Sequence, residues 1–184
     1  AALSFLSMVL YGFVYTPLKR IGPIAVFIGA FPGALPPLIG WVAVTGEIIG
    51  VNLVSGEVEM MGLILFGIQF VWQFPHFWAI AWVGDEDYRR AGFRLLPNRG
   101  EKNITTAFNI MIYALFLIPI SLLPHYFGVT GIKSAVVVSF AGIAFLYQTI
   151  ELMKTCDRKA ALKMMFGSFF YLPIVQVAFV IDKI

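Results

Sequence analysis

Apolar and polar residues alternate along the chain as six long apolar segments joined by short polar connections. The apolar segments cover residues 1–14, 24–44, 60–82, 104–124, 132–153 and 164–182. A helix rises about 1.5 Å per residue, so about 20 residues cross the roughly 30 Å hydrocarbon core of a bilayer. The last five segments have this length, whereas the first is too short and is interpreted as the end of a membrane helix that starts before residue 1. The pattern predicts an all-α fold: a polytopic membrane helical bundle that forms a single domain over residues 1–184.

Segment 24–44 has a composition that is unusual for a spanning helix. It contains three prolines, which remove backbone donors: Pro32, Pro36 and Pro37. The glycines Gly29 and Gly33 form a small-xxx-small pair that allows a neighbouring helix to approach closely. We expect a kinked helix, and two interpretations of it stay open: helix packing alone, or backbone carbonyls left free to be satisfied by protein or cavity water.

The composition excludes an ordinary soluble domain. Hydrophobic residues make up 60% of the chain and charged residues 12%, which leaves too few charges to cover a water-facing surface. The single cysteine, Cys156, excludes an internal disulfide and a cysteine metal site. The net charge of +3 does not imply nucleic acid, because basic loops on one side of the bilayer are expected of any inner-membrane protein.

Lys and Arg residues are concentrated in every second connection. Two, five and four of them, eleven in all, fall in connections 15–23, 83–103 and 154–163, whereas 45–59 and 125–133 together contain only Lys133. Because basic loops of membrane proteins face the cytoplasm, this asymmetry places the three basic connections in the cytosol. We therefore predict a multi-pass protein of the bacterial cell (inner) membrane with its charged loops on the cytoplasmic side.

The connection after segment 60–82 carries an acidic cluster followed by a basic one. The acids are Asp85, Glu86 and Asp87, and the bases are Arg89, Arg90, Arg94 and Arg99. This order suits a metal-bridged phosphate ester, since carboxylates hold Mg²⁺ and guanidinium groups take the remaining phosphate charge. In an extended segment, Asp85 and Asp87 project to the same side and can share one cation. The structural alternative is a solvated helix end in which Asp87 pairs with Arg90.

His76 lies inside the apolar segment 60–82, about six residues from the end that leads into the charged connection. It is surrounded in sequence by aromatic residues: Trp72, Phe74, Phe77 and Trp78. Polar groups at this depth usually face a bundle interior or a cavity, and π-faces suit a flat conjugated acceptor or an isoprenoid cation. The alternative is that His76 bonds a neighbouring helix, and that the aromatic residues pack or face lipid. Lys19 and Arg20, on the same predicted side, are either membrane anchors or ligands of an anion.

Four motifs carry a resemblance to a known family. They are YTPLKR (15–20), GALPPLIGWVAVTG (33–46), WQFPHFWAIAW (72–82) and DYRRAGFRLLP (87–97). In this order they resemble the protoheme IX farnesyltransferase (heme O synthase) family of UbiA-type intramembrane prenyltransferases. The resemblance covers essentially the whole chain. It implies a bundle of nine spanning helices, of which this sequence supplies the end of the fourth through the ninth.

The resemblance also implies a reaction and its participants. Farnesyl diphosphate loses diphosphate with the help of Mg²⁺, and a vinyl group of heme B captures the allylic cation, giving heme O for heme A biosynthesis. The implied cofactor is Mg²⁺, and the implied partners are heme B, farnesyl diphosphate, the lipid bilayer and heme A synthase.

Roles carried over by position fall into three groups. Asp87 and Asp85 would be catalytic, and with Glu86 they would hold the Mg²⁺-diphosphate. The diphosphate contacts would be Lys19, Arg20 and Arg94. His76, with Trp72, would contact the heme acceptor.

The sequence departs from the superfamily pattern at both acidic motifs. The second motif is usually D-x-x-x-D, but Arg89 stands four residues after Asp85. The first motif, N-x-x-x-D, is absent, so the 184 residues alone are expected to be inactive. Three alternatives stay open: a quinone-type aromatic prenyltransferase of the same superfamily, a small transporter with a broken helix, and a non-enzymatic membrane assembly protein.

The charge asymmetry leads to a topological prediction. In a variant with Cys156 replaced by serine, single cysteines at Ser55 and Asp85 should react with a membrane-impermeant thiol reagent from opposite faces of the membrane. Reaction of both cysteines from one face would contradict the topology and the shared cytoplasmic position of the basic connections.

Overall fold

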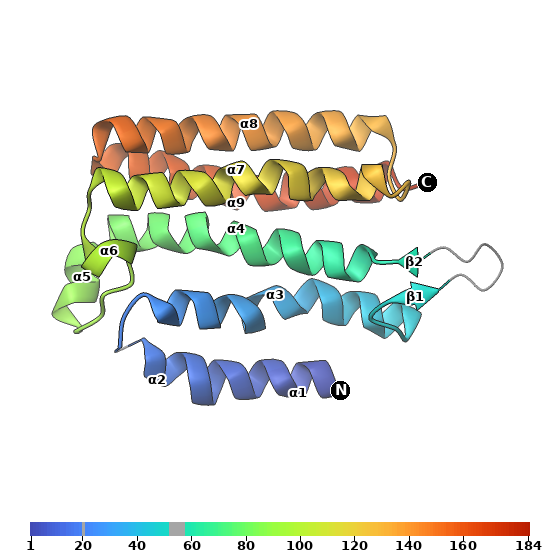
Figure 1. Cartoon of the computed structure of the whole chain (residues 1–184), viewed down its shortest axis with the longest axis horizontal. Helices are drawn as coiled ribbons and strands as arrows, with labels where there is room; N and C mark the ends of the chain where they lie inside the picture. The colour runs from blue at the N-terminus through green and yellow to red at the C-terminus, as the bar shows by residue number, and fades with distance from the viewer. Residues whose placement is uncertain (20, 52–57) are drawn as a thin grey trace.

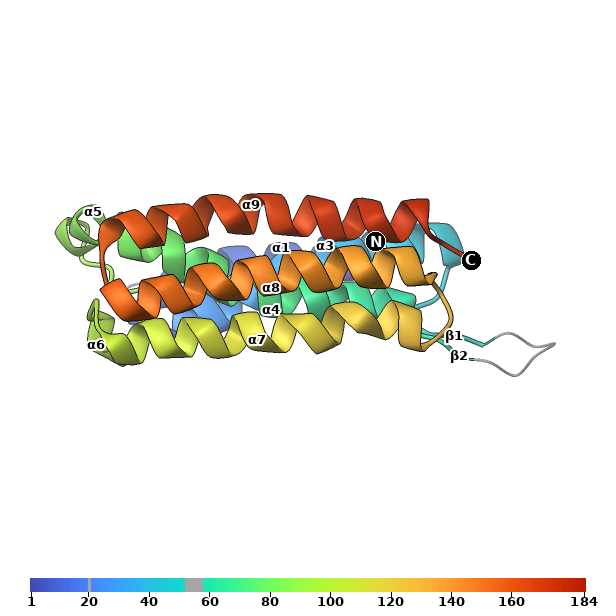
Figure 2. The same ribbon diagram turned by 90° about the horizontal axis from the view of Figure 1, so that it is seen from above.

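The computed structural model describes residues 1–19, 21–51 and 58–184, and they form a bundle of long helices that run side by side (Figures 1 and 2). Five helices are long and apolar enough to cross a membrane: α3 (Ile24–Thr45), α4 (Met61–Val83), α7 (Ile104–Tyr126), α8 (Ile132–Thr155) and α9 (Arg158–Ile181). Their starts and ends match four of the predicted segments to within two residues. The predicted all-α polytopic bundle is therefore confirmed.

The first segment forms a shorter helical run that packs against α3. It consists of α1 (Ala2–Val9), the π-helix η1 (Leu10–Tyr15) and α2 (Thr16–Leu18). The apolar pattern alone placed its end near residue 14. The run continues four residues further, to Leu18, because the backbone stays helical through Thr16 and Pro17.

Helix α9 begins six residues before the predicted start at 164. Its N-cap is Asp157, whose Oδ1 accepts a hydrogen bond from the N–H of Ala160 at 2.7 Å. The first turns carry basic residues, which lowered the local hydropathy and hid the helix. One of them, Lys163, donates to Glu151 Oε1 of α8 at 2.6 Å, so the basic residues here lie on helices as well as in the connection.

Helix α3 stays continuous through its three prolines. Pro36 cannot donate to the carbonyl of Pro32, and Ser7 Oγ donates to that carbonyl instead, at 3.3 Å. The carbonyl freed by a proline is therefore satisfied by protein, as one of the two sequence interpretations required. The two small residues face different neighbours: Gly29 packs on the ring of Tyr15, and Gly33 on the side chain of Gln73.

Helix α4 lies in the middle of the bundle and packs against α3, α7 and α9. Its largest fully buried side chains, Phe74 and Trp82, form the core together with residues of the flanking helices such as Leu117 and Met164. Helix α4 carries His76 and Trp72, the residues predicted to contact the heme acceptor. Its packing against three neighbouring helices therefore fixes the directions of these two side chains.

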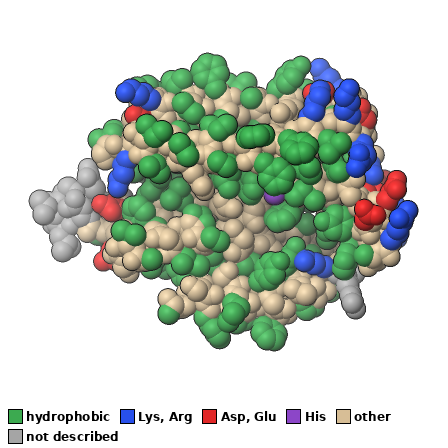
Figure 3. Space-filling view, turned by 180° about the vertical axis from the view of Figure 1, so that it is seen from behind, with side chains coloured by type: hydrophobic (Ala, Val, Ile, Leu, Met, Phe, Trp, Pro, Cys, Tyr) green, Lys and Arg blue, Asp and Glu red, His purple; other side chains and the backbone are tan. Residues whose placement is uncertain are grey.

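The short elements lie at the two ends of the bundle. One end, called the α5 end here, carries α5 (Asp85–Arg90), α6 (Pro97–Gly100) and the connections α2–α3 and α8–α9 (Figure 1). The opposite end, the hairpin end, carries the strands β1 (Gly50–Val51) and β2 (Val58–Glu59), the α7–α8 connection and residue 184. All three basic connections thus meet at the α5 end. Figure 3 shows charged side chains toward the two ends and hydrophobic ones between them, as a membrane-spanning bundle requires.

Candidate functional site

The acidic cluster lies on a helix, so of the two interpretations left open by the sequence the helix end is the one observed, and the extended segment is not. Residues Asp85–Arg90 form α5, whose first turn holds all three acids. With 3.6 residues per turn, positions two apart point to nearly opposite sides of a helix. The side chain of Asp85 is only 14% exposed, whereas that of Asp87 is 87% exposed. The two carboxylates therefore face different surroundings and do not share one cation by themselves.

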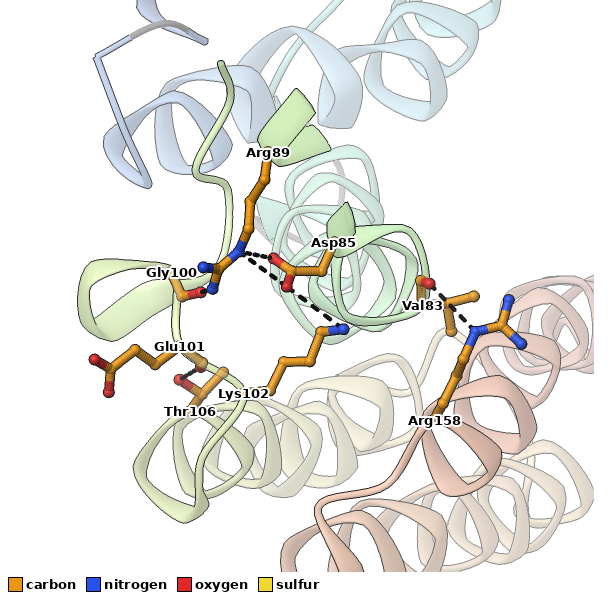
Figure 4. A network of polar contacts seen from close by, with 8 residues as sticks. All are labelled: Val83, Asp85, Arg89, Gly100, Glu101, Lys102, Thr106 and Arg158. Carbon is orange, nitrogen blue, oxygen red and sulfur yellow. Dashed lines mark hydrogen bonds and ion pairs between the residues drawn. The ribbon is translucent and has the colours of Figure 1, made fainter. Parts of the chain in front are cut away.

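Asp85 is the centre of a polar network (Figure 4). Arg89 Nε donates to its carboxylate at 3.0 Å, and Lys102 Nζ lies 3.4 Å away. The same Arg89 donates from Nη2 to the carbonyl of Gly100 at 2.6 Å. These bonds tie α5 to the connection that leads into α7, and two cations already neutralise the Asp85 carboxylate.

The side chains of Asp87 and Glu86 are exposed, so their negative charges are accessible to a cation. Asp87 lies 3.9 Å from Arg90, the pairing expected of a solvated helix end, and both side chains are exposed. An exposed pair of this kind contributes little, typically about 0–1 kcal/mol. No three Asp, Glu, His or Cys side chains converge as a metal site among the residues that the structure describes. However, Mg²⁺ bound with substrate phosphates usually takes only one or two protein carboxylates, and Asp87 with Glu86 fits that mode.

Lys19 lies at the same end as the acidic helix. It lines a pocket of about 120 Å³ together with Tyr88 of α5 and Phe77 of α4. Its Nζ lies 4.4 Å from the centre of the Tyr15 ring, a cation–π distance. The structure thus brings Lys19 next to α5, which the sequence alone could not establish.

The other predicted diphosphate contacts are less fully defined by the geometry. Arg94 is exposed, in the connection between α5 and α6, and packs near Gly100. Arg20 lies outside the described residues. Tyr15 and Tyr88, which sequence reasoning did not single out, also line the pocket. Tyr15 could have been found, since it stands four residues before Lys19, one helical turn away.

His76 is buried, 7% exposed, between α4 and α9. Its Nδ1 lies 2.8 Å from Ser168 Oγ, and that hydroxyl lies 2.6 Å from the carbonyl of Met165. A carbonyl only accepts, so the hydroxyl hydrogen goes to Met165 and Oγ must accept from His76. The imidazole therefore carries its hydrogen on Nδ1, which leaves the Nε2 lone pair free for another partner.

The same serine holds the aromatic neighbour of the histidine. Trp72 stacks on the imidazole, with ring centres 4.3 Å apart and planes 15° apart, and its Nε1 donates to the Ser168 carbonyl at 3.0 Å. Phe169 packs edge-on at 4.9 Å. Sequence reasoning missed Ser168; the signal available was a polar residue within an apolar segment, but not which helix it would face.

Helix α4 connects the histidine to the acidic helix α5. His76 precedes Asp85 by nine residues of α4 and its C-cap, which is about 13 Å of helix. Helix α4 thus carries the buried imidazole and aromatic pair, and the charged α5 end of the bundle follows directly after it.

Comparisons with known proteins show which family the chain resembles. The family model described as "UbiA prenyltransferase family" matches residues 1–172. The chain is 57% identical, over 99% of its length and 60% of the relative's, to a protoheme IX farnesyltransferase of Cytophaga hutchinsonii. It is 42% identical to a protein of the same name from Christiangramia forsetii, covering 97% of this chain and 57% of that one. The chain thus spans about three fifths of the length of these relatives.

A solved structure has a similar fold. It comes from a study of digeranylgeranylglyceryl phosphate synthase in membranes, and it superposes with a TM-score of 0.68 at 19% identity. The match covers 98% of this chain and 59% of that chain. At this identity the likeness concerns the fold alone.

The hydrogen-bond chain at His76 leads to a spectroscopic prediction. In ¹⁵N-histidine-labelled protein, His76 should show a protonated Nδ1 and an unprotonated Nε2, and Ser168→Ala should remove this preference because the acceptor is gone. The other histidine, His125, is the control: its Nδ1 bonds the Thr130 carbonyl at 3.1 Å and should not change. A protonated Nε2 at His76 in the unmodified protein would contradict the assignment.

Proposed function

The chain belongs to the UbiA prenyltransferase family, and on this premise we propose that it is part of an enzyme that transfers the farnesyl group of farnesyl diphosphate to a vinyl group of heme B, forming heme O. The names of the most similar relatives support this substrate pair. The observation that carries the proposal is that the charged α5 end of the bundle directly follows α4, the helix that holds the stacked pair His76 and Trp72. Since the chain spans three fifths of its relatives, the activity is proposed for the whole protein.

The α5 end binds the diphosphate in this proposal. Lys19, Arg94 and Arg20 neutralise phosphate oxygens, and Asp87 with Glu86 supplies carboxylates for Mg²⁺. When bound, Mg²⁺ withdraws charge from the leaving diphosphate. Asp85, predicted as a further metal ligand and catalytic residue, is assigned to hold α5 in place, because Arg89 and Lys102 already neutralise it.

The middle of α4 binds the acceptor. The Nε2 lone pair of His76 is available to the heme iron, and the Trp72 ring keeps the imidazole plane fixed. The apolar surroundings exclude water while the carbon–oxygen bond to diphosphate breaks and its electron pair leaves with the oxygen. The π electrons of the vinyl group then form the new carbon–carbon bond, and water adds to the resulting cation and releases a proton, which gives the hydroxyethylfarnesyl side chain.

Product analysis tests the proposal directly. A completed enzyme can be made by joining this chain to the two fifths of the Cytophaga relative that it does not match. With Mg²⁺, farnesyl diphosphate and heme B, the completed enzyme should give a product with the mass of heme O, and the 184-residue chain alone should give none. An aromatic quinone precursor offered in parallel should stay unmodified. Prenylation of the quinone precursor instead of heme B would assign the chain to the other branch of the superfamily.

Two substitutions in the completed enzyme should separate loss of diphosphate from binding of the acceptor. Asp87→Asn should abolish Mg²⁺-dependent binding of a non-hydrolysable farnesyl diphosphate analogue and lower the rate by about 10²–10³, the effect of losing one electrostatic contact of the transition state. His76→Ala should weaken heme B binding and leave the analogue nearly unaffected. Each variant is titrated with both ligands.

Glu151→Gln is the matched control, because it removes an exposed acid at the same end of the bundle. It should change neither titration. If His76→Ala lost the analogue and kept heme, or Asp87→Asn kept Mg²⁺-dependent analogue binding, the assignment of these two roles would be wrong.

A further inference from the structure

A second pocket, of about 350 Å³, lies at the hairpin end between α3, α4 and α9, away from the acidic helix. Its walls are largely apolar, but four residues with polar side chains line it: Trp41, Thr130, Gln176 and Lys183. The proposed roles above use none of these four residues, and of the four only Trp41 lies within a family motif, GALPPLIGWVAVTG (33–46).

Two of these side chains have buried polar atoms without a partner. Trp41 Nε1 and Thr130 Oγ1 are among four such atoms in the part of the chain that the structure describes, and they line the same pocket. Thr130 is only 1% exposed. Gly62 fixes the place of the indole, because a Cβ there would come within 2.6 Å of the Trp41 ring. An indole N–H can only donate and a hydroxyl can donate, so both atoms call for a ligand that accepts hydrogen bonds.

Lys183 adds a positive charge at the same pocket. The ion pairs among the described residues do not include it, and its neighbour Asp182 is engaged elsewhere, accepting from the N–H of Ser134 at 2.7 Å. Eleven of the thirteen Lys and Arg residues belong to the basic connections at the other end, so the basic-loop asymmetry does not explain Lys183. Donors together with a cation select an anionic acceptor, such as a carboxylate.

The α4 residues of the pocket wall lie on the same face of α4 as His76. Met61 and Leu65 of the pocket wall recur at helical spacing with Trp72 and His76 on one face of α4. Leu65 and His76 are eleven residues apart, about 16 Å, and on α9 the residues Gln176 and Ser168 are eight apart, about 12 Å. These separations, about 12–16 Å between Cα levels, are spanned by the half of a porphyrin that carries the propionates together with the side chains of both sites.

We propose that this pocket binds the propionate carboxylates of the porphyrin acceptor. The inference rests on the proposed function and adds the orientation of the substrate. In heme B the two propionates occupy one half of the ring and the two vinyl groups the other. With the propionates at Lys183, Trp41 and Thr130 and the iron near His76, a vinyl group points toward the α5 end, where the allylic cation forms.

The test compares heme B with its dimethyl ester, which keeps the ring, iron and vinyl groups but lacks the carboxylate charge. Both are titrated into the completed enzyme and followed by the Soret band. The unmodified enzyme should bind heme B about tenfold or more tightly than the ester, the effect of a hydrogen bond to a charged group. Lys183→Met and Thr130→Val should each remove most of that difference and leave the affinity for the ester unchanged.

Lys133→Met is the control, since it removes the other base at the hairpin end, outside this pocket, and should change neither affinity. Equal affinities for heme B and the ester in the unmodified enzyme, or equal loss of both in Lys183→Met, would overturn the inference and leave the proposed function standing. The inference would also be overturned if Lys183→Met lost binding of palmitate but kept its affinity for heme B, because the pocket would then bind a lipid. If neither porphyrin bound to the unmodified enzyme, the proposed function itself would fail.

Discussion

Inside a bilayer, a polar side chain has no water to bind, and the position of α4 follows from this constraint. Gln73 donates to the carbonyl of Ala30 on α3, and His76 and Trp72 both bond Ser168 on α9. These hydrogen bonds run from α4 to a helix on each of two sides, α3 and α9, and therefore fix the rotation of α4 about its own axis. Apolar packing against α7 tolerates small rotations, but hydrogen bonds of this geometry do not. The direction of the imidazole is therefore set by contacts on both flanks of the helix.

Hydropathy was enough to predict the spanning helices, because burial in lipid imposes length and composition on each of them. Hydropathy did not predict where α9 starts, because the charged residues in the first turns of this helix have the composition of a loop. Hydropathy also could not predict the conformation of α5, since five of its six residues are charged and carry no apolar periodicity, and an acidic first turn is compatible with a helix or an extended segment. The predicted roles of Asp85 and Asp87 depended on that conformation.

The family motifs identified His76 and Lys19 but not the residues that position them. Ser168 is separated from His76 by 92 residues, and Tyr88 lines the same pocket as Lys19 although the two are far apart in the sequence. Contacts of this kind depend on which helices are neighbours and on how each is rotated, and neither can be read from one sequence. The pocket at the hairpin end could not be predicted for the same reason: the four residues with polar side chains that line it come from three distant parts of the chain.

The α8 and α9 helices are joined at both ends. A short connection links them at the α5 end, and at the hairpin end Gly131 N–H donates to the carbonyl of Asp182, whose carboxylate also caps α8. Because they are joined at both ends, α8 and α9 cannot separate from each other. If the bundle opens between α4 and α9 to admit a bulky planar ligand, the two hydrogen bonds to Ser168 have to break.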